Sequence, residues 1–307
     1  MRTAFIKTLS QIAEADPNIM LLVGDLGFGV VQEFADRFPQ QFVNVGVAEQ
    51  NMAGVATGLA LSGKIVFTYS IANFPILRCL EQLRNDACYH SANVVSVSVG
   101  GGFSYGALGM THHGTEDISI MRSLPEMTVI APGDPLETQA ATRAAAKGIG
   151  PVFLRLGRAG EPEVHDGSQS WDLGKAIVLR NGKDVTLVST GAMLQTTVHA
   201  ADMLAQDGID ARVISMHTVK PLDNEAVLQA ARETGALLTV EEHSQIGGLG
   251  SAVAEVLFEA KTCSIPCKRI ALPDEFCNHV GDQWYLRGMY GLTTENIVLE
   301  AKKLVVE

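Results

Sequence analysis

Basic residues are scarce in this sequence of 307 residues. Lysine and arginine number 23 against 34 aspartate and glutamate residues, which gives a formal net charge of −11 at pH 7. A surface that binds nucleic acid needs a basic stripe against the phosphates, and electrostatic attachment to a membrane needs a basic cluster. The acidic balance therefore argues against nucleic acid and membrane as partners. It still allows a phosphorylated small molecule, which a single arginine can hold.

Long apolar runs and a cysteine framework are missing as well. The sequence has no run of about 20 apolar residues, the length that spans a bilayer. Residues 1–19 carry charges and lack the apolar centre of a signal peptide.

The five cysteines are odd in number and dispersed, which favours a reducing compartment, so we expect a cytoplasmic protein. Cys263 and Cys267 have no second ligand pair at zinc spacing, and we expect no metal ligands in this chain.

Short apolar runs alternate with longer amphipathic stretches. The runs that predict strands in the first half are 19–27, 42–46, 65–70, 93–102, 127–133 and 151–158. They are continuously apolar and separated by helical patterns, so they indicate a parallel sheet covered by helices on both faces. This is a doubly wound α/β domain.

A polar segment rich in Gly, Pro, Asp and Ser interrupts the pattern and predicts a linker. After it, strands and helices alternate again over about 130 residues, enough for a second, smaller α/β domain. We therefore predict a first domain at 1–160, a linker at 161–174 and a second domain at 175–307.

Glu49 is the first candidate for chemistry. It lies where a predicted strand leads into a helix, at the carboxyl edge of the sheet, where open α/β sheets bind ligands. Its neighbours are small or apolar, so its carboxyl group would be partly desolvated and suited to sharing a proton with a ligand nitrogen. The plainer alternative is an acid that complements the dipole at a helix N-terminus.

The glycine-rich segment 100–114 and two arginines are further candidates. The segment ends in His112 and His113, which suits close approach of backbone to a ligand and proton transfer near neutral pH; a flexible surface loop is the alternative. Arg155 and Arg158 follow the last predicted strand of the first domain. They can bind phosphate or carboxylate, although salt bridges explain them equally well.

Several segments together resemble one family. They are GDL at 24–26, GVAEQNMAGVATGLA at 46–60, YSIANFPILRCLEQLRND at 69–86, GMTHHGTEDISIMRSLPEM at 109–127, PGD at 132–134, PVFLRLGR at 151–158, TVKPLD at 218–223 and EEHSQIGGLGSAV at 241–253. Their order and spacing resemble the pyrimidine-binding and C-terminal domains of the transketolase superfamily of thiamine diphosphate enzymes. The likeness covers essentially the whole chain and is greatest to the C-terminal subunit of a split transketolase.

The resemblance implies roles at a thiamine diphosphate site. Glu49 would be the acid that hydrogen-bonds N1′ of the aminopyrimidine and favours the imino form that removes the thiazolium C2 proton. Phe74 would stack on the pyrimidine ring, and core packing is its alternative. Asp25 and Leu26 would lie beside the cofactor. His112 would face the cofactor's amino group and the substrate hydroxyls, as a catalytic residue.

The resemblance also implies substrate contacts and two departures. His113 would bind substrate in place of the usual glutamine, and Arg158 would hold a sugar phosphate. Leu108 stands where full-length transketolases have an acid for an acceptor hydroxyl, and Gly100 where they have a histidine. The cofactor chemistry is thus expected to be intact, with a specialised sugar as substrate.

A partner subunit is the last implication. The superfamily binds the diphosphate and Mg²⁺ through a Gly-Asp-Gly segment that an asparagine follows, and we find none after a suitable strand. A separate subunit should supply that domain, giving a heterotetramer with two copies of this chain in contact and no activity for this chain alone. The expected reaction moves a two-carbon ketol unit from a ketose, which we expect to be phosphorylated, to an aldose or aldehyde.

Other functions fit parts of the sequence. The β subunit of a 2-oxo acid dehydrogenase has the same two domains, and a deoxyxylulose-phosphate synthase is also similar. A binding or assembly module without catalysis is a different class, but retention of Glu49, His112 and Asp25 argues against it. His243 and residues 247–250 are interpreted as structural or interface elements, and residues 274–290 have no assigned chemistry.

Overall fold

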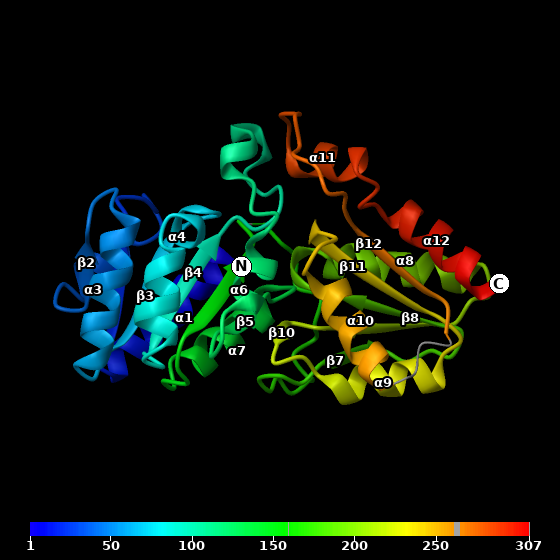
Figure 1. Cartoon of the computed structure of the whole chain (residues 1–307), viewed down its shortest axis with the longest axis horizontal. Helices are drawn as coiled ribbons and strands as arrows, with labels where there is room; N and C mark the ends of the chain where they lie inside the picture. Colours follow the sequence, from blue (N-terminus) through cyan, green and yellow to red (C-terminus); the bar gives the residue numbers. More distant parts are fainter. Residues whose placement is uncertain (159, 261–264, 307) are drawn as a thin grey trace.

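A computed structural model describes residues 1–158, 160–260 and 265–306. Two α/β modules lie side by side, each built on its own sheet (Figure 1). Cys263, half of the cysteine pair noted above, lies outside the described residues. Within the described ranges, no helix combines the length and the hydropathy needed to cross a bilayer.

The N-terminal module is built on a seven-stranded sheet in the order β10-β5-β6-β4-β3-β1-β2. All pairings among its first six strands are parallel, which confirms the predicted arrangement. These strands are β1 (Ile19–Val23), β2 (Phe42–Asn44), β3 (Ile65–Ile71), β4 (Val94–Val99), β5 (Thr128–Ile130) and β6 (Val152–Leu156).

Helices cover both faces of this sheet, as predicted. Alternate residues of β1 divide between two cores: Met20 and Leu22 face one, and Ile19, Leu21 and Val23 face the other. The first core is closed by α3 (Glu49–Leu61), α4 (Phe74–Leu77), the π-helix η1 (Leu83–Cys88) and α6 (Asp117–Ser123), and the second by α1 (Arg2–Ala15), α2 (Gln32–Arg37) and α7 (Pro135–Ala145). Buried strands therefore read as continuous apolar runs.

Two helical regions differ from the sequence pattern. The helix α1 was not predicted, although it buries Phe5 and Leu9 completely. The segment 76–90, whose apolar residues recur at the spacing of a single helix, is divided into α4, α5 (Leu80–Gln82) and η1. The division is at Cys79, whose backbone leaves the helical region (φ −119°, ψ 23°).

The C-terminal module has a five-stranded sheet in the order β12-β11-β8-β9-β7. Its strands are β7 (Ile177–Arg180), β8 (Val185–Ser189), β9 (Ala211–Ser215), β11 (Leu237–Ser244) and β12 (Cys267–Leu272). The helices α8 (Leu194–Gln206) and α12 (Thr294–Val306) close one face, and α9 (Asn224–Glu233) and α10 (Leu249–Glu259) close the other. The short helix α11 (Gln283–Met289) lies beside the loop region of the N-terminal module (Figure 1).

Neither sheet is purely parallel. The strand β10 (Thr218–Lys220) comes from the second half of the chain but pairs antiparallel with β5 of the N-terminal sheet. At the edge of the C-terminal sheet, β7 pairs antiparallel with β9. Both are edge strands of three or four residues, too short to show a periodic pattern. The two modules therefore share backbone hydrogen bonds that a division at the linker does not anticipate.

The segment between the modules is held by a buried ionic clasp. Asp134, the N-cap of α7, accepts hydrogen bonds from the backbone of Val164 and His165 and from His165 Nδ1 at 2.9–3.0 Å. His165 Nε2 lies 3.2 Å from Glu137 Oε1. Burial by itself would lower the pKa of His165, but the two carboxylates raise it to about 9. The hydrogen bonds likewise outweigh burial and lower the pKa of Asp134 to about 2.

This clasp predicts a loss of stability at alkaline pH. Folded His165 keeps its proton up to about pH 9, whereas an unfolded histidine loses it near 6.5, so the stabilisation is complete below 6.5 and disappears as pH rises through 9. We expect the free energy of unfolding to fall by roughly 3 kcal/mol over this interval, measured by urea denaturation. His165→Gln should remove this slope, and His199→Gln, at an exposed histidine of α8, should keep it. An unchanged slope in His165→Gln would contradict the assignment.

Candidate functional site

Glu49 begins α3 at the carboxyl edge of the N-terminal sheet. Only 2% of its side chain is exposed. Gly24, just after β1, lies next to it: a methyl group there would be in van der Waals contact with Glu49 Oε1, at 3.6 Å. Ser70 Oγ, near the end of β3, lies 3.5 Å from the same oxygen. Three neighbouring strand ends thus converge on one buried carboxyl group, at the edge where such sheets bind ligands.

Arg78 is the main partner of Glu49, and the sequence analysis missed it. Its Nη1 lies 3.0 Å from Glu49 Oε2, and its Cζ lies 4.3 Å from the centre of the Phe74 ring. The available signal was its position four residues after Phe74, a spacing that brings side chains together on helical backbone. His112 contacts the other side of this group: its ring meets Phe74 edge-on at 5.1 Å. The structure therefore links Glu49 to Phe74 through Arg78, and Phe74 to His112.

Asp25 and Leu26 occupy the turn that follows Gly24. Asp25 is exposed, and its backbone N–H and its carboxylate are both hydrogen-bonded by the amide of Asn44 at 3.0 Å. Its φ of +54° is a left-handed conformation that aspartate tolerates better than most residues. Leu26 is half-buried against the core on the α1 side. The two residues share the sheet edge with Glu49.

His113 has a different environment from His112. It is 3% exposed, and its ring packs edge-on against Phe103 at 5.0 Å. Its backbone carbonyl accepts a hydrogen bond from Asn73. Burial lowers the pKa of His113, and its Nε2 has no hydrogen-bond partner in the part of the chain that the structure describes. The two adjacent histidines thus pack against different aromatic rings, His112 against Phe74 and His113 against Phe103.

The two arginines of the β6 region have different roles. Arg155 is buried, and its Nε donates to Asp117 Oδ2 at 2.8 Å. Its Nη2 donates to the carbonyls of Gly114 and Glu242, so the salt-bridge interpretation holds for Arg155. Arg158 is exposed, and its Cζ lies 5.2 Å from the ring centre of Tyr105.

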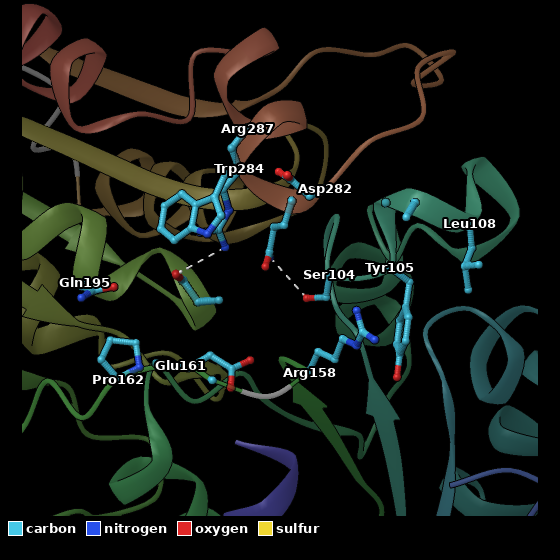
Figure 2. Close-up of a pocket in the computed structure, with 16 residues that line it drawn as sticks. Ser104, Tyr105, Leu108, Arg158, Glu161, Pro162, Gln195, Asp282, Trp284 and Arg287 are labelled. Carbon is cyan, nitrogen blue, oxygen red and sulfur yellow. Dashed lines mark hydrogen bonds between the residues drawn. The ribbon is translucent and has the colours of Figure 1, made fainter. Parts of the chain in front are cut away.

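Arg158 lines a cleft of about 440 Å³ between the modules (Figure 2). Glu49, Phe74, Arg78 and His112, the Glu49 group, are not among the residues that line this cleft. Tyr105 and Leu108 stand on the same wall, on the loop that continues to His112. The opposite wall belongs to the C-terminal module and includes Gln195, Asp282, Gln283, Trp284 and Arg287. Residues 282–287, to which the sequence assigned no chemistry, therefore face Arg158.

Tyr105 explains the departure at Gly100. A methyl group at Gly100 would lie 2.2 Å from Tyr105 Cδ2, and Gly100 has φ +98°. The tyrosine ring therefore occupies the place of any side chain at position 100, and only glycine fits there. The sequence analysis did not select Tyr105, because an aromatic residue in a loop has no diagnostic spacing.

A buried carboxylate joins this loop to the C-terminal module. Glu242 accepts hydrogen bonds from Phe103 N at 3.0 Å, from Gln283 Nε2 at 2.9 Å and from Arg287 Nη2 at 2.7 Å. A methyl group at Gly102 would lie 2.4 Å from its Cδ, so glycine is required for this contact. Glu242 fixes the loop and α11 against each other.

The neighbouring His243 and residues 247–250 serve packing. Glu241 accepts hydrogen bonds from the N–H groups of Leu249 and Gly250 at 2.7 and 2.8 Å, and it thereby caps α10. Burial raises the pKa of Glu241 to about 7 and lowers the pKa of His243 to about 4.

Across the described ranges, His, Cys, Asp and Glu side chains form no group of three or more that could hold a metal ion.

Comparison with protein families covers both modules. Residues 1–161 match the model of the transketolase pyrimidine-binding domain, and residues 174–297 match that of the transketolase C-terminal domain. The chain is 40% identical over 306 residues to an apulose-4-phosphate transketolase subunit of Phocaeicola vulgatus, covering 99% of this chain and 97% of that protein. It is 41% identical over 305 residues to the 6-deoxy-6-sulfo-D-fructose transketolase subunit SqwH of a Clostridium species, covering 99% and 94%.

A solved structure agrees with this relationship. It is described as a split-gene transketolase in an inactive β4 tetramer, is 41% identical, and superposes with a TM-score of 0.92 over 99% of this chain and 98% of that one.

The Glu49–Arg78 pair predicts a stability coupling. Arg78→Met leaves the buried Glu49 carboxylate without its cation, and because Arg78 is half-exposed we expect a modest loss of roughly 1–2 kcal/mol in the free energy of unfolding. Adding Glu49→Gln should recover part of this loss, since no buried charge then remains. Urea denaturation of the two single variants and the double variant measures the coupling. Arg84→Met, at an exposed arginine nearby, is the control, and additive single effects would contradict the pairing.

Proposed function

This chain belongs to the transketolase family, and we propose that it is the subunit of a split transketolase that carries the pyrimidine-binding and C-terminal domains, with boundaries at 1–160, 161–174 and 175–307. The enzyme would move a two-carbon ketol unit from a ketose, phosphorylated or otherwise anionic, to an aldose or aldehyde. The observation that carries this proposal is the buried Glu49 carboxyl group beside Phe74 and His112 at the carboxyl edge of the sheet.

The residues around Glu49 fit the aminopyrimidine of thiamine diphosphate. The guanidinium of Arg78 donates a hydrogen bond to Glu49 and lies over the ring of Phe74. The space between the Glu49 carboxyl group and the Phe74 ring therefore accommodates a planar group that carries N–H donors. Glu49 and Phe74 would hold the pyrimidine, and Asp25 and Leu26 would line the site from the neighbouring turn. When bound, the cofactor supplies a nucleophilic carbon and an electron sink for the donor carbonyl.

The chain's own residues would manage protons and orientation. Glu49, shielded from water, would hold a proton at a carboxyl oxygen against a cofactor nitrogen. Thr111 Oγ1 lies 3.0 Å from His112 Nδ1. A hydroxyl that donates to Nδ1 keeps the ring proton on Nε2, from which His112 would donate to a substrate oxygen. The buried, neutral His113 would act by supporting the loop rather than by charge.

A partner subunit would complete the site. Loops at the carboxyl edge expose large apolar side chains: Phe28 is 84% exposed and Val47, two residues before Glu49, is 73% exposed. Apolar exposure beside a catalytic group suits coverage by another protein. The partner would bring the domain that holds the diphosphate and Mg²⁺, and two copies of each chain would form a heterotetramer. The buried thiols of Cys79, Cys88 and Cys277 form no disulfide, which supports a cytoplasmic location.

Reconstitution tests the proposal directly. This chain is mixed with the candidate partner subunit, thiamine diphosphate and Mg²⁺, and offered ketose donors beside pyruvate. Transfer of a two-carbon unit from a ketose to an aldehyde is expected, with no turnover by this chain alone. Pyruvate consumption with release of CO₂ would instead assign the chain to the 2-oxo acid enzymes.

Glu49→Gln should reduce kcat at least 100-fold, because an amide cannot give a proton to the cofactor nitrogen. Far-UV circular dichroism and co-purification with the partner should be unchanged. Glu81→Gln, at an exposed glutamate of α5, is the matched control and should keep wild-type turnover. Near-normal activity of Glu49→Gln would overturn the role of Glu49.

Arg158→Ala should raise KM about tenfold for a phosphorylated ketose and leave kinetics on its unphosphorylated counterpart within twofold. The physical reason is loss of an exposed guanidinium that can bind a phosphate in two hydrogen bonds. The control is Arg84→Ala, which changes the same charge at an exposed position elsewhere. Equal effects on both sugars would remove the phosphate assignment.

A further inference from the structure

We propose that the cleft between the modules is a sugar-phosphate site in which the C-terminal module, through Gln195 and Trp284, recognises the far end of the substrate. This inference rests on the proposed function for the identity of the ligand. The cleft, by contrast, is complete within one chain: its walls come from residues 104–108 and 158–162 on one side and from α8 and α11 on the other (Figure 2).

Arg287 fixes the C-terminal wall of the cleft. Its side chain is 4% exposed and lines the cleft. Its Nη2 donates to Glu242 and, at 3.4 Å, to the carbonyl of Ala192 on the cleft wall (Figure 2). Its Nε is buried without a hydrogen-bond partner among the described residues. Arg287 therefore acts by holding Glu242 and Ala192 in place and so fixing the shape of this wall of the cleft.

The charges of the cleft suit a polyol with an anion at one end. Glu161 is neutralised by the amino group of Met1 at 2.7 Å, and Arg287 by Glu242. Arg158 contributes a cation on one wall and Asp282 an anion on the other. A simple anion would be attracted by Arg158 on one wall and repelled by Asp282 on the other. A sugar phosphate would instead place its phosphate at Arg158 and its hydroxyls toward Asp282 and Gln195.

Trp284 and Gln195 are the specificity groups of the opposite wall. Trp284 is 65% exposed despite its size, and its ring faces the cleft across from Arg158 (Figure 2). An indole face of this kind packs against the apolar C–H surface of a sugar. Gln195 lies in the first turn of α8 and lines the same cleft, where its side-chain amide can donate to and accept from a substrate hydroxyl.

The altered N-terminal wall explains why the C-terminal module is needed. Leu108 and the Gly100–Tyr105 pair replace two polar groups that the family resemblance leads one to expect on that wall. Leu108 is 57% exposed at the cleft and offers no hydrogen bond. Recognition of hydroxyls therefore passes to the facing residues, while the loop that bears Tyr105 and Leu108 continues to His112.

Kinetics of the reconstituted enzyme test the substrate role. Trp284→Ala and Gln195→Ala should each raise KM for a phosphorylated ketose about fivefold, with kcat within twofold, because they remove binding that is present before the reaction. Gln206→Ala, an exposed position at the other end of α8, is the matched control. Unchanged KM in both cleft variants would overturn the proposal.

Tryptophan fluorescence tests the site without turnover. The sequence has two tryptophans, and Trp171 is stacked on His217 at 4.6 Å, away from the cleft lining. In Trp171→Phe the emission of Trp284 alone should change saturably with fructose 6-phosphate, and should not change with fructose or inorganic phosphate at the same millimolar concentrations. Arg158→Ala in the same background should weaken the titration at least tenfold.

The two experiments separate the proposals. A Trp284 titration by the sugar phosphate in a chain whose reconstituted complex transfers no ketol unit would overturn the proposed function and support the cleft. Ketol transfer with no response of Trp284 to fructose 6-phosphate would support the function and overturn the cleft. A response to inorganic phosphate as large as to the sugar phosphate would also overturn it, because the sugar would then contribute nothing.

Discussion

The buried carboxylate of Glu242 is the contact on which the functional surface depends. It lies on β11 of the C-terminal module, yet it accepts hydrogen bonds from the backbone of Phe103 and from Gln283 and Arg287. The loop that bears His112 and the helix that bears Trp284 are thus attached to one charged group. Removing such a group from water is costly unless its oxygens are bonded, so these contacts hold the loop and α11 in the positions that line the cleft.

Several contacts join the two modules and support the surface that bears the cleft. The strand β10 adds C-terminal backbone to the N-terminal sheet, Arg155 joins Asp117 to the carbonyl of Glu242, and His165 is held between Asp134 and Glu137. Flexible linkers let domains move independently; here the connecting segment is part of a buried ionic cluster. Sites that lie between the modules can therefore be as well ordered as sites within one of them.

The Glu49 group and the cleft divide the chemistry between them. Around Glu49, a buried carboxyl group, an aromatic ring and a histidine meet at an edge whose apolar side chains are left uncovered. In the cleft, charged and polar groups of one chain are already in place on both walls. Under the function proposed above, the Glu49 group would share its cofactor with a partner subunit, and the cleft would recognise part of the substrate within this chain.

The alternation of buried parallel strands and helices in each module, the position of Glu49 before a helix and the family membership could be predicted from local pattern, because continuous apolar runs, glycine turns and motif spacing are properties of neighbouring residues. The same holds for Arg158 at a strand end. Arg78, Tyr105, Arg287 and Trp284 could not be predicted: their significance lies in contacts with residues distant in the sequence, such as Gly100 for Tyr105 and Glu242 for Arg287. Likewise, β10 is too short to carry a pattern, and only tertiary packing decided which sheet it joins, because its backbone donors found their partners on β5.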